Sequence, residues 1–288
     1  MTTALSRRLL RGRVAGLRIR ESGPPAGPAA RLARRVWPPL LAVGLVLLVW
    51  ETLVLVGWKP AYVLPAPATV AGELVTLLAS PDFWTAITIT MVRALVGFAV
   101  SLAIGTVLGI AVSRWGLLRN ALGALLTGLQ TMPSIAWFPL AILFFGISEQ
   151  AILFVIVLGA APSIANGLIS GVDDVPPQLL RTAHVLGARG LGLYRWVVLP
   201  AALPAYLSGL KQGWAFAWRS LMAGELLVII ASRPSLGAQL SFFRELSNAP
   251  GLLATMVVIL VIGMAVDGGF STIAKRVRSR RGLGAARL

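Results

Sequence analysis

The sequence predicts an all-α integral membrane protein with six transmembrane helices, and its composition, segment lengths and charge placement carry this prediction. Of its 288 residues, 57% are hydrophobic and 12% are charged, whereas soluble domains average about 25% charged residues. So few charges cannot coat a water-soluble surface of this size. Apolar windows of about 20 residues, the length that crosses a bilayer as a helix, occur six times. These windows are too long, and alternate too little in polarity, for membrane β-strands.

The six predicted spans lie within residues 36–271. They are, in order, Val36–Trp58, Thr85–Val112, Asn120–Gly146, Gln150–Gly171, Pro204–Ala231 and Gly251–Ser271. The third contains Pro133, where we expect a break in the helix. Pairs of glycines four residues apart, typical of close helix packing, occur at Gly105/Gly109, Gly167/Gly171 and Gly209/Gly213. We therefore expect a tight bundle between two tails, residues 1–35 and 272–288.

The positive charges indicate which ends of the spans lie inside the cell. The chain has 26 Lys and Arg against 10 acidic residues, and nine arginines precede residue 36. Cationic segments stay on the cytoplasmic side, and six spans then place 21 of the 26 cations there, with both termini. The +16 charge is thus a topological signal, and we expect the tails to contact anionic lipid headgroups. A nucleic-acid partner is not expected, since a basic nucleic-acid-binding protein does not account for six apolar spans.

The long cytoplasmic loop at residues 172–203 has a pattern of its own. A helix is predicted from Gln178 to Leu186, Gly187 breaks it, and a second helical piece leads to Leu199. Apolar residues recur at helical spacing in both pieces, while the arginines face elsewhere. The loop is therefore predicted to be an amphipathic helix-turn-helix that lies in a groove of another protein or on lipid headgroups.

This loop resembles the EAA loop of importer-type ABC transporter permeases. That motif places nine residues between a glycine and an aliphatic-x-Leu-Pro sequence, as here between Gly187 and Val197, with Leu199-Pro200 closing it. The Glu-Ala-Ala triplet of the family falls on Arg181-Thr182-Ala183, where only Ala183 keeps its type. The spacing is thus conserved in this loop, whereas the family glutamate is replaced.

The resemblance extends over roughly residues 60–272 and is greatest to permeases for sulfonate, taurine and nitrate. It rests on Leu64–Pro67, on Arg93 with Gly97-Phe98, on Met132–Leu140, on Phe145–Glu149 and on Trp218–Glu225. The Phe-Gly-Ile-x-Glu run and the Lys-Gln-Gly-Trp-Ala run look most similar to aliphatic-sulfonate permeases. The resemblance implies the type I ABC importer permease fold in a bacterial cell (inner) membrane.

The family resemblance also implies which partners the chain has and which subunits bind ATP. Such a chain forms the translocation path and assembles with two ABC ATPase subunits, an external solute-binding protein and a second copy of itself. The sequence has no phosphate-binding P-loop, so we expect ATP and Mg²⁺ to be bound by the ATPase partners, and neither an enzyme nor a cofactor or metal site in this chain. The residues implied in coupling to the ATPase are Arg181, Thr182, Ala183, His184, Gly187, Ala188, Leu199 and Pro200.

Polar residues within the spans are candidates for the translocation path, because ionisable groups in a membrane are costly and are usually functional. These candidates are Arg93, Gln130, Met132, Ser134, Gln212, Arg219 and Glu225. Arg93 alternatively extends its side chain to the membrane interface, or makes a structural hydrogen bond to a neighbouring span. Arg219 either braces the bundle or offsets the dehydration of a permanent anion such as a sulfonate. Arg219 and Glu225 are about 240° apart around a helix, so we do not expect them to pair.

Three alternatives to a sulfonate importer stay open. The same kind of transporter carries taurine, nitrate or a thiamine precursor in related families. An ATP-independent secondary transporter would be expected to show inverted repeats with paired broken helices, and no such duplication is visible in the sequence. A membrane enzyme would need a cluster of His, Asp and Glu, whereas the chain has one His and well-separated acids.

Overall fold

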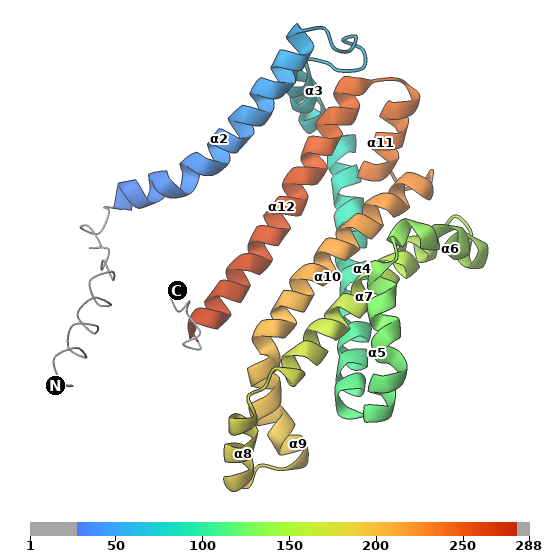
Figure 1. Cartoon of the computed structure of the whole chain (residues 1–288). Helices are drawn as coiled ribbons and strands as arrows, with labels where there is room; N and C mark the ends of the chain where they lie inside the picture. The colour runs from blue at the N-terminus through green and yellow to red at the C-terminus, as the bar shows by residue number, and fades with distance from the viewer. Residues whose placement is uncertain (1–27, 281–288) are drawn as a thin grey trace, which may run out of the picture. The chain divides into compact units, whose positions relative to one another are not determined.

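The structure is a computed structural model that describes residues 28–280, and all regular secondary structure in this part of the chain is helical (Figure 1). Residues 1–27 and 281–288, which are the outer parts of the two predicted tails, lie outside the described residues. Contacts between Cα atoms divide the chain after Trp58 into two units.

The first unit contains one described helix, α2 (Pro28–Leu55). It begins before the predicted start of the first span, so residues 28–35 of the predicted tail are helical. Its stretch Trp37–Leu55 is long and apolar enough to cross a membrane, and none of these side chains is buried within the chain. A helix that is hydrophobic on all sides suits a lipid or protein environment on every face.

The second unit contains the other helices. They are α3 (Pro67–Ala79), α4 (Pro81–Arg114), α5 (Gly116–Thr131), the 3₁₀ helix η1 (Ser134–Trp137), α6 (Phe138–Phe145), α7 (Glu149–Asp173), α8 (Pro177–Val185), α9 (Gly190–Leu193), the π-helical turn η2 (Tyr194–Val198), α10 (Leu199–Leu227), α11 (Leu236–Glu245) and α12 (Ala249–Arg280). Proline opens α3, α4 and α8. A proline costs no hydrogen bond in the first helical turn, because the N–H groups there have no partner within the helix.

Helix α7 forms the centre of the second unit. It packs against α4 and against α10, and Val155, Ile156 and Ile164 on α7 are fully buried. Leu221 of α10 is fully buried as well and belongs to the same hydrophobic cluster as Val155 and Ile156. The predicted fourth and fifth spans are therefore neighbours in the core.

The predicted glycine pairs lie where these helices cross. A Cβ atom on Gly167 of α7 would lie 2.5 Å from the Cα atom of Gly209 on α10, and one on Gly105 of α4 would lie 2.6 Å from the Ala161 carbonyl oxygen. Such separations are too short for a side chain, so the backbones touch only because these residues are glycines. The prediction of a tight bundle is confirmed at both crossings.

The third predicted span is broken rather than continuous. Helix α5 ends at Thr131, and the following helical segment from Ser134 to Phe145 is bent from it by 105°. Pro133 lies between the two pieces, and its ring prevents the helix from continuing. The expected break at this residue is confirmed. Because the bend is so large, the predicted span consists of two helical segments, called the bent pair below.

The count of six apolar spans is not confirmed by length and composition alone. Four helices meet those criteria, α2, α4, α7 and α12, and the bent pair is a fifth if it is counted as one span. Helix α10, at the place of the fifth predicted span, is long enough at 29 residues but is not among them. Its mean hydropathy is lowered by polar residues, among them Lys211, Gln212 and Arg219. The prediction from sequence rested on the length of the segment and did not take these residues into account.

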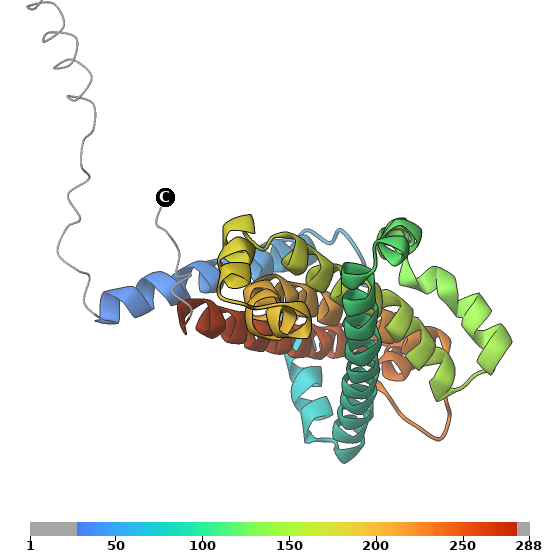
Figure 2. The same ribbon diagram turned by 90° about the horizontal axis from the view of Figure 1, so that it is seen from below.

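The cationic loops predicted to face the cytoplasm gather at one end of the second unit. Helices α8 and α9 lie at this end, opposite α3 and α11, and face the viewer in the view from below (Figures 1 and 2). The guanidinium of Arg119 forms an ion pair of 2.7 Å with Asp173, and that of Arg114 lies 5.2 Å from the ring centre of Tyr194. The end of α4 and the start of α5 therefore lie at the same end of the unit as the end of α7 and the η2 turn, in accordance with the predicted topology.

Candidate functional site

Two cavities lie beside α10, on the side of α5 and α7. The first, the Arg219 cavity, has a volume of about 300 Å³ and is lined by residues 129–135, Gly159, Phe216 and Arg219. The second, the Gln212 cavity, has about 440 Å³ and is lined by Gln130, Ser163, Asn166, Gly167, Ser170, Ala205, Ser208, Gly209 and Gln212. Gln130 lines both, so the two cavities are neighbours.

Five of the seven predicted pathway residues line these cavities, namely Gln130, Met132, Ser134, Gln212 and Arg219. The bend at Pro133 places the residues before and after it at the Arg219 cavity. Irregular backbone is tolerated at membrane depth where it is buried in protein or lines a cavity. The structure thus brings together residues from the broken span and from α10 that the sequence could not place side by side.

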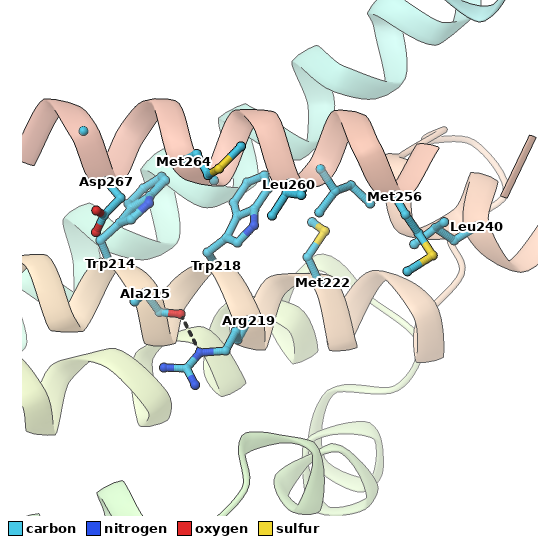
Figure 3. A pocket seen from close by; sticks show the side chains of 13 residues that line it. Trp214, Ala215, Trp218, Arg219, Met222, Leu240, Met256, Leu260, Met264 and Asp267 are labelled. Carbon is cyan, nitrogen blue, oxygen red and sulfur yellow. Dashed lines mark hydrogen bonds between the residues drawn. The ribbon is translucent and has the colours of Figure 1, made fainter. Parts of the chain in front are cut away.

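The Arg219 guanidinium lies on the opposite side of α10 from two tryptophans. Trp214 and Trp218 point toward α12, where they line a third, largely apolar cavity of about 630 Å³ whose lining also includes Arg219 (Figure 3). Arg219 points away from them; its Nε donates to the Ala215 carbonyl oxygen at 3.1 Å, and its guanidinium carbon lies 4.8 Å from the centre of the Phe216 ring. Within the described chain Arg219 forms no ion pair, so its positive charge is uncompensated beside the cavity.

The other two predicted pathway residues, Arg93 and Glu225, lie elsewhere in a buried ionic cluster. Arg93 donates through Nε and Nη2 to the two carboxylate oxygens of Glu149 at 2.8 and 2.6 Å, and through Nη1 to Glu225 at 2.9 Å. Arg93 is 5% exposed and Glu225 is 0% exposed. Neither residue lines the two cavities. The geometry matches the alternative weighed for Arg93, a structural hydrogen bond to neighbouring spans, and Arg219 does not pair with Glu225, as expected.

The same cluster holds the start of α11. Glu225 accepts hydrogen bonds from the Thr90 hydroxyl at 2.9 Å and from the Gly237 N–H at 3.1 Å, and Thr90 Oγ1 accepts from the Leu236 N–H at 3.0 Å. A carboxylate at a helix N-terminus satisfies N–H groups that have no partner in the helix. Sequence reasoning missed the roles of Thr90 and Glu149, because the pairing joins segments far apart in the chain.

The predicted coupling loop is a helix that ends in a glycine-capped turn. Helix α8 ends at Val185, and Gly187 follows in the left-handed region with φ +83°. The Gly187 N–H donates to the His184 carbonyl at 3.0 Å, and the Ala188 N–H donates to the Ala183 carbonyl at 2.9 Å. These two bonds form a Schellman motif, in which glycine is favoured because it has no Cβ atom. The predicted helix, break and second helical piece are all present.

The end of this loop presents apolar side chains. Val185, Leu186, Leu191 and Trp196 are between 73% and 87% exposed. The arginines of the same loop, Arg181, Arg189 and Arg195, are exposed as well, and so is His184. Thr182 is exposed too, Ala183 is buried, and Leu199 and Pro200 begin α10. Exposed apolar patches of this kind mark surfaces that contact another protein or a membrane.

A multi-span helical unit with cavities lined in part by polar side chains, and with an exposed amphipathic loop at one end, is typical of a membrane transport subunit. The chain belongs to the family described as binding-protein-dependent transport system inner membrane component, whose model matches residues 101–279. It is therefore a multi-pass membrane protein and a permease component of an ABC importer.

Known proteins similar to this chain fit the same family. A putative aliphatic sulfonates transport permease of Escherichia coli (strain K12) is 31% identical over 244 residues, covering 84% of this chain and 90% of the relative. A riboflavin transport system permease of Chloroflexus aurantiacus is 31% identical, covering 83% and 92%. An inward-facing structure of the MetNI methionine ABC transporter matches with a TM-score of 0.53 at 21% identity, covering 67% of this chain and 93% of that chain. The fold is that of type I importer permeases.

Proposed function

We propose that this chain is the transmembrane permease subunit of an ATP-driven importer for a small organic anion, with aliphatic sulfonates as the substrate. The observation that carries the proposal is the Arg219 guanidinium, which forms no ion pair in the described chain and lines one of two neighbouring cavities. A cation on the path offsets part of the cost of removing an anion from water. The similarity to the putative sulfonate permease supports this substrate class.

The proposed assembly contains two permease copies, two ATPase subunits and an external binding protein. The exposed apolar residues Val185, Leu186, Leu191 and Trp196 supply a surface for the ATPase, together with the exposed arginines of the same loop. Gly187 lies at the turn of this loop. ATP and Mg²⁺ bind to the ATPase partners, which perform the hydrolysis. The coupling loop lies on the cytoplasmic side with both termini, in accordance with the positive-inside rule.

Growth and uptake measurements distinguish aliphatic sulfonates from the alternative substrates. A strain lacking this gene is expected to lose growth on alkanesulfonates as the sole sulfur source and to regain it when the gene is restored. Loss of growth on taurine or nitrate instead would assign those substrates. Copurification of an ATPase after mild detergent extraction is expected, and ATP-independent uptake would contradict the proposal.

Replacing Arg219 by glutamine is expected to lower kcat/KM for alkanesulfonate uptake by about tenfold, because a charge-assisted hydrogen bond contributes about 1.5–3 kcal/mol. The measurement is ATP-driven uptake by the complete transporter in proteoliposomes. Arg276→Gln, an exposed cation of α12 outside both cavities, is the matched control and is expected to change uptake less than about twofold. Unchanged kinetics in Arg219→Gln would show that Arg219 has no role in substrate transport.

A further inference from the structure

The α7 wall of the Gln212 cavity is polar, although α7 is one of the most buried helices of the protein. Ser163, Asn166 and Ser170 all line this cavity. They follow one another at spacings of three and four residues, which places them on one face of the helix. Gln212 lines the cavity from α10 and Gln130 from α5. This spacing is visible in the sequence, but sequence reasoning did not single it out.

One hydroxyl of this wall has no hydrogen-bond partner. Ser163 is 2% exposed, and its Oγ atom is buried without a partner among the described residues. Leaving a buried polar group unpaired is unfavourable, and native proteins pair most such groups. The Asn166 and Gln212 amides also make no hydrogen bond within the described chain. The cavity therefore contains donor groups that the protein itself leaves unused.

Two glycines allow the helices that line this cavity to approach each other closely. Gly167 and Gly209, where α7 and α10 cross, both line it. A Cβ atom on either would lie within 2.6 Å of the other glycine's Cα atom. Larger residues would therefore force the helices apart at the place where the polar side chains of α7 and α10 meet.

We propose that Ser163, Asn166 and Ser170 of α7, with Gln212 of α10, form a hydrogen-bonding site for the oxyanion group of the transported substrate. This inference rests on the proposed function and adds a second group of residues, besides Arg219, that contact the substrate. A sulfonate has three acceptor oxygens and one negative charge, which suits several neutral N–H and O–H donors. Neutral donors bind an anion less tightly than a second cation, so the substrate can also leave.

Asn166→Asp is the decisive variant, because it puts a carboxylate where the oxyanion would bind. In the complete transporter with its ATPase and binding protein in proteoliposomes, we expect radiolabelled pentanesulfonate uptake to fall at least about tenfold, since like charges in contact cost several kcal/mol. Asn166→Gln keeps the donors and is expected to retain most uptake. Asn120→Asp, on the exposed face of α5 and outside both cavities, is the matched control for an added charge.

Ser163→Ala separates a substrate role from a structural one. Because the hydroxyl has no partner, its removal should leave thermal stability unchanged or raised, while the KM for pentanesulfonate rises. Wild-type uptake kinetics in both Asn166→Asp and Ser163→Ala would overturn the inference, as would lower stability with an unchanged KM. If the wild-type transporter takes up no pentanesulfonate, the sulfonate assignment fails first, and the site assignment falls with it.

Discussion

Replacing Gly187 by leucine is expected to abolish uptake while the chain still inserts into the membrane. Gly187 has φ +83°, a conformation that costs an ordinary residue roughly 1–2 kcal/mol. No atom lies within 4 Å of the place where its Cβ would stand, so the cost comes from the backbone and not from a clash. The turn would open, the Schellman bonds to His184 and Ala183 would be lost, and the apolar residues after α8 would no longer face one partner groove.

The measurement compares uptake and ATPase binding with the amount of protein in the membrane. Gly187→Asn is expected to keep more activity than Gly187→Leu, because asparagine tolerates the left-handed region better than other side chains. Gly123→Leu on α5, also with no atom within 4 Å and without a positive φ, is the matched control and should transport normally. Normal uptake by Gly187→Leu would contradict the coupling role of this turn.

The sequence predicted the features that depend on local geometry. The Gly-to-Leu-Pro spacing located the turn at Gly187, and a proline located the break at Pro133. The glycine pairs predicted close helix packing, because a helix needs small residues to approach another closely. What the pairs could not show is which helices meet, as Gly167 and Gly209 do, since the same motif occurs on three helices.

The sequence could not predict how polar residues of the spans divide between the cavities and the ionic cluster. Arg93, Arg219 and Glu225 are all ionisable groups in apolar segments and look alike in a hydropathy window. Only the packing of α4, α7 and α10 separates them, because it buries Arg93 against Glu225 and leaves Arg219 beside a cavity. The angular argument on a single helix did predict that Arg219 and Glu225 do not pair.

Replacing Arg93 by methionine is expected to destabilise the protein by about 3–5 kcal/mol, the cost of removing one partner from a buried ion pair. Methionine fills similar space but leaves Glu225, with no exposed surface, without its cation. Glu149 is 28% exposed and has Arg233 at 3.9 Å, so it can be partly hydrated, whereas Glu225 cannot. The start of α11, which the Glu225 carboxylate binds through the Gly237 N–H, should loosen as well.

Thermal unfolding of the purified protein in lipid nanodiscs is the measurement, and a midpoint lower by on the order of 10 °C is expected for Arg93→Met. Arg233→Met removes a cation that is 59% exposed, and as the matched control it should cost less than about 1 kcal/mol. The double variant with Arg93→Met and Glu225→Met removes the uncompensated buried charge, so it should recover part of the loss. Equal midpoints for Arg93→Met and the wild type would mean that this cluster contributes little to stability, and Arg93 would return to the candidates for the translocation path.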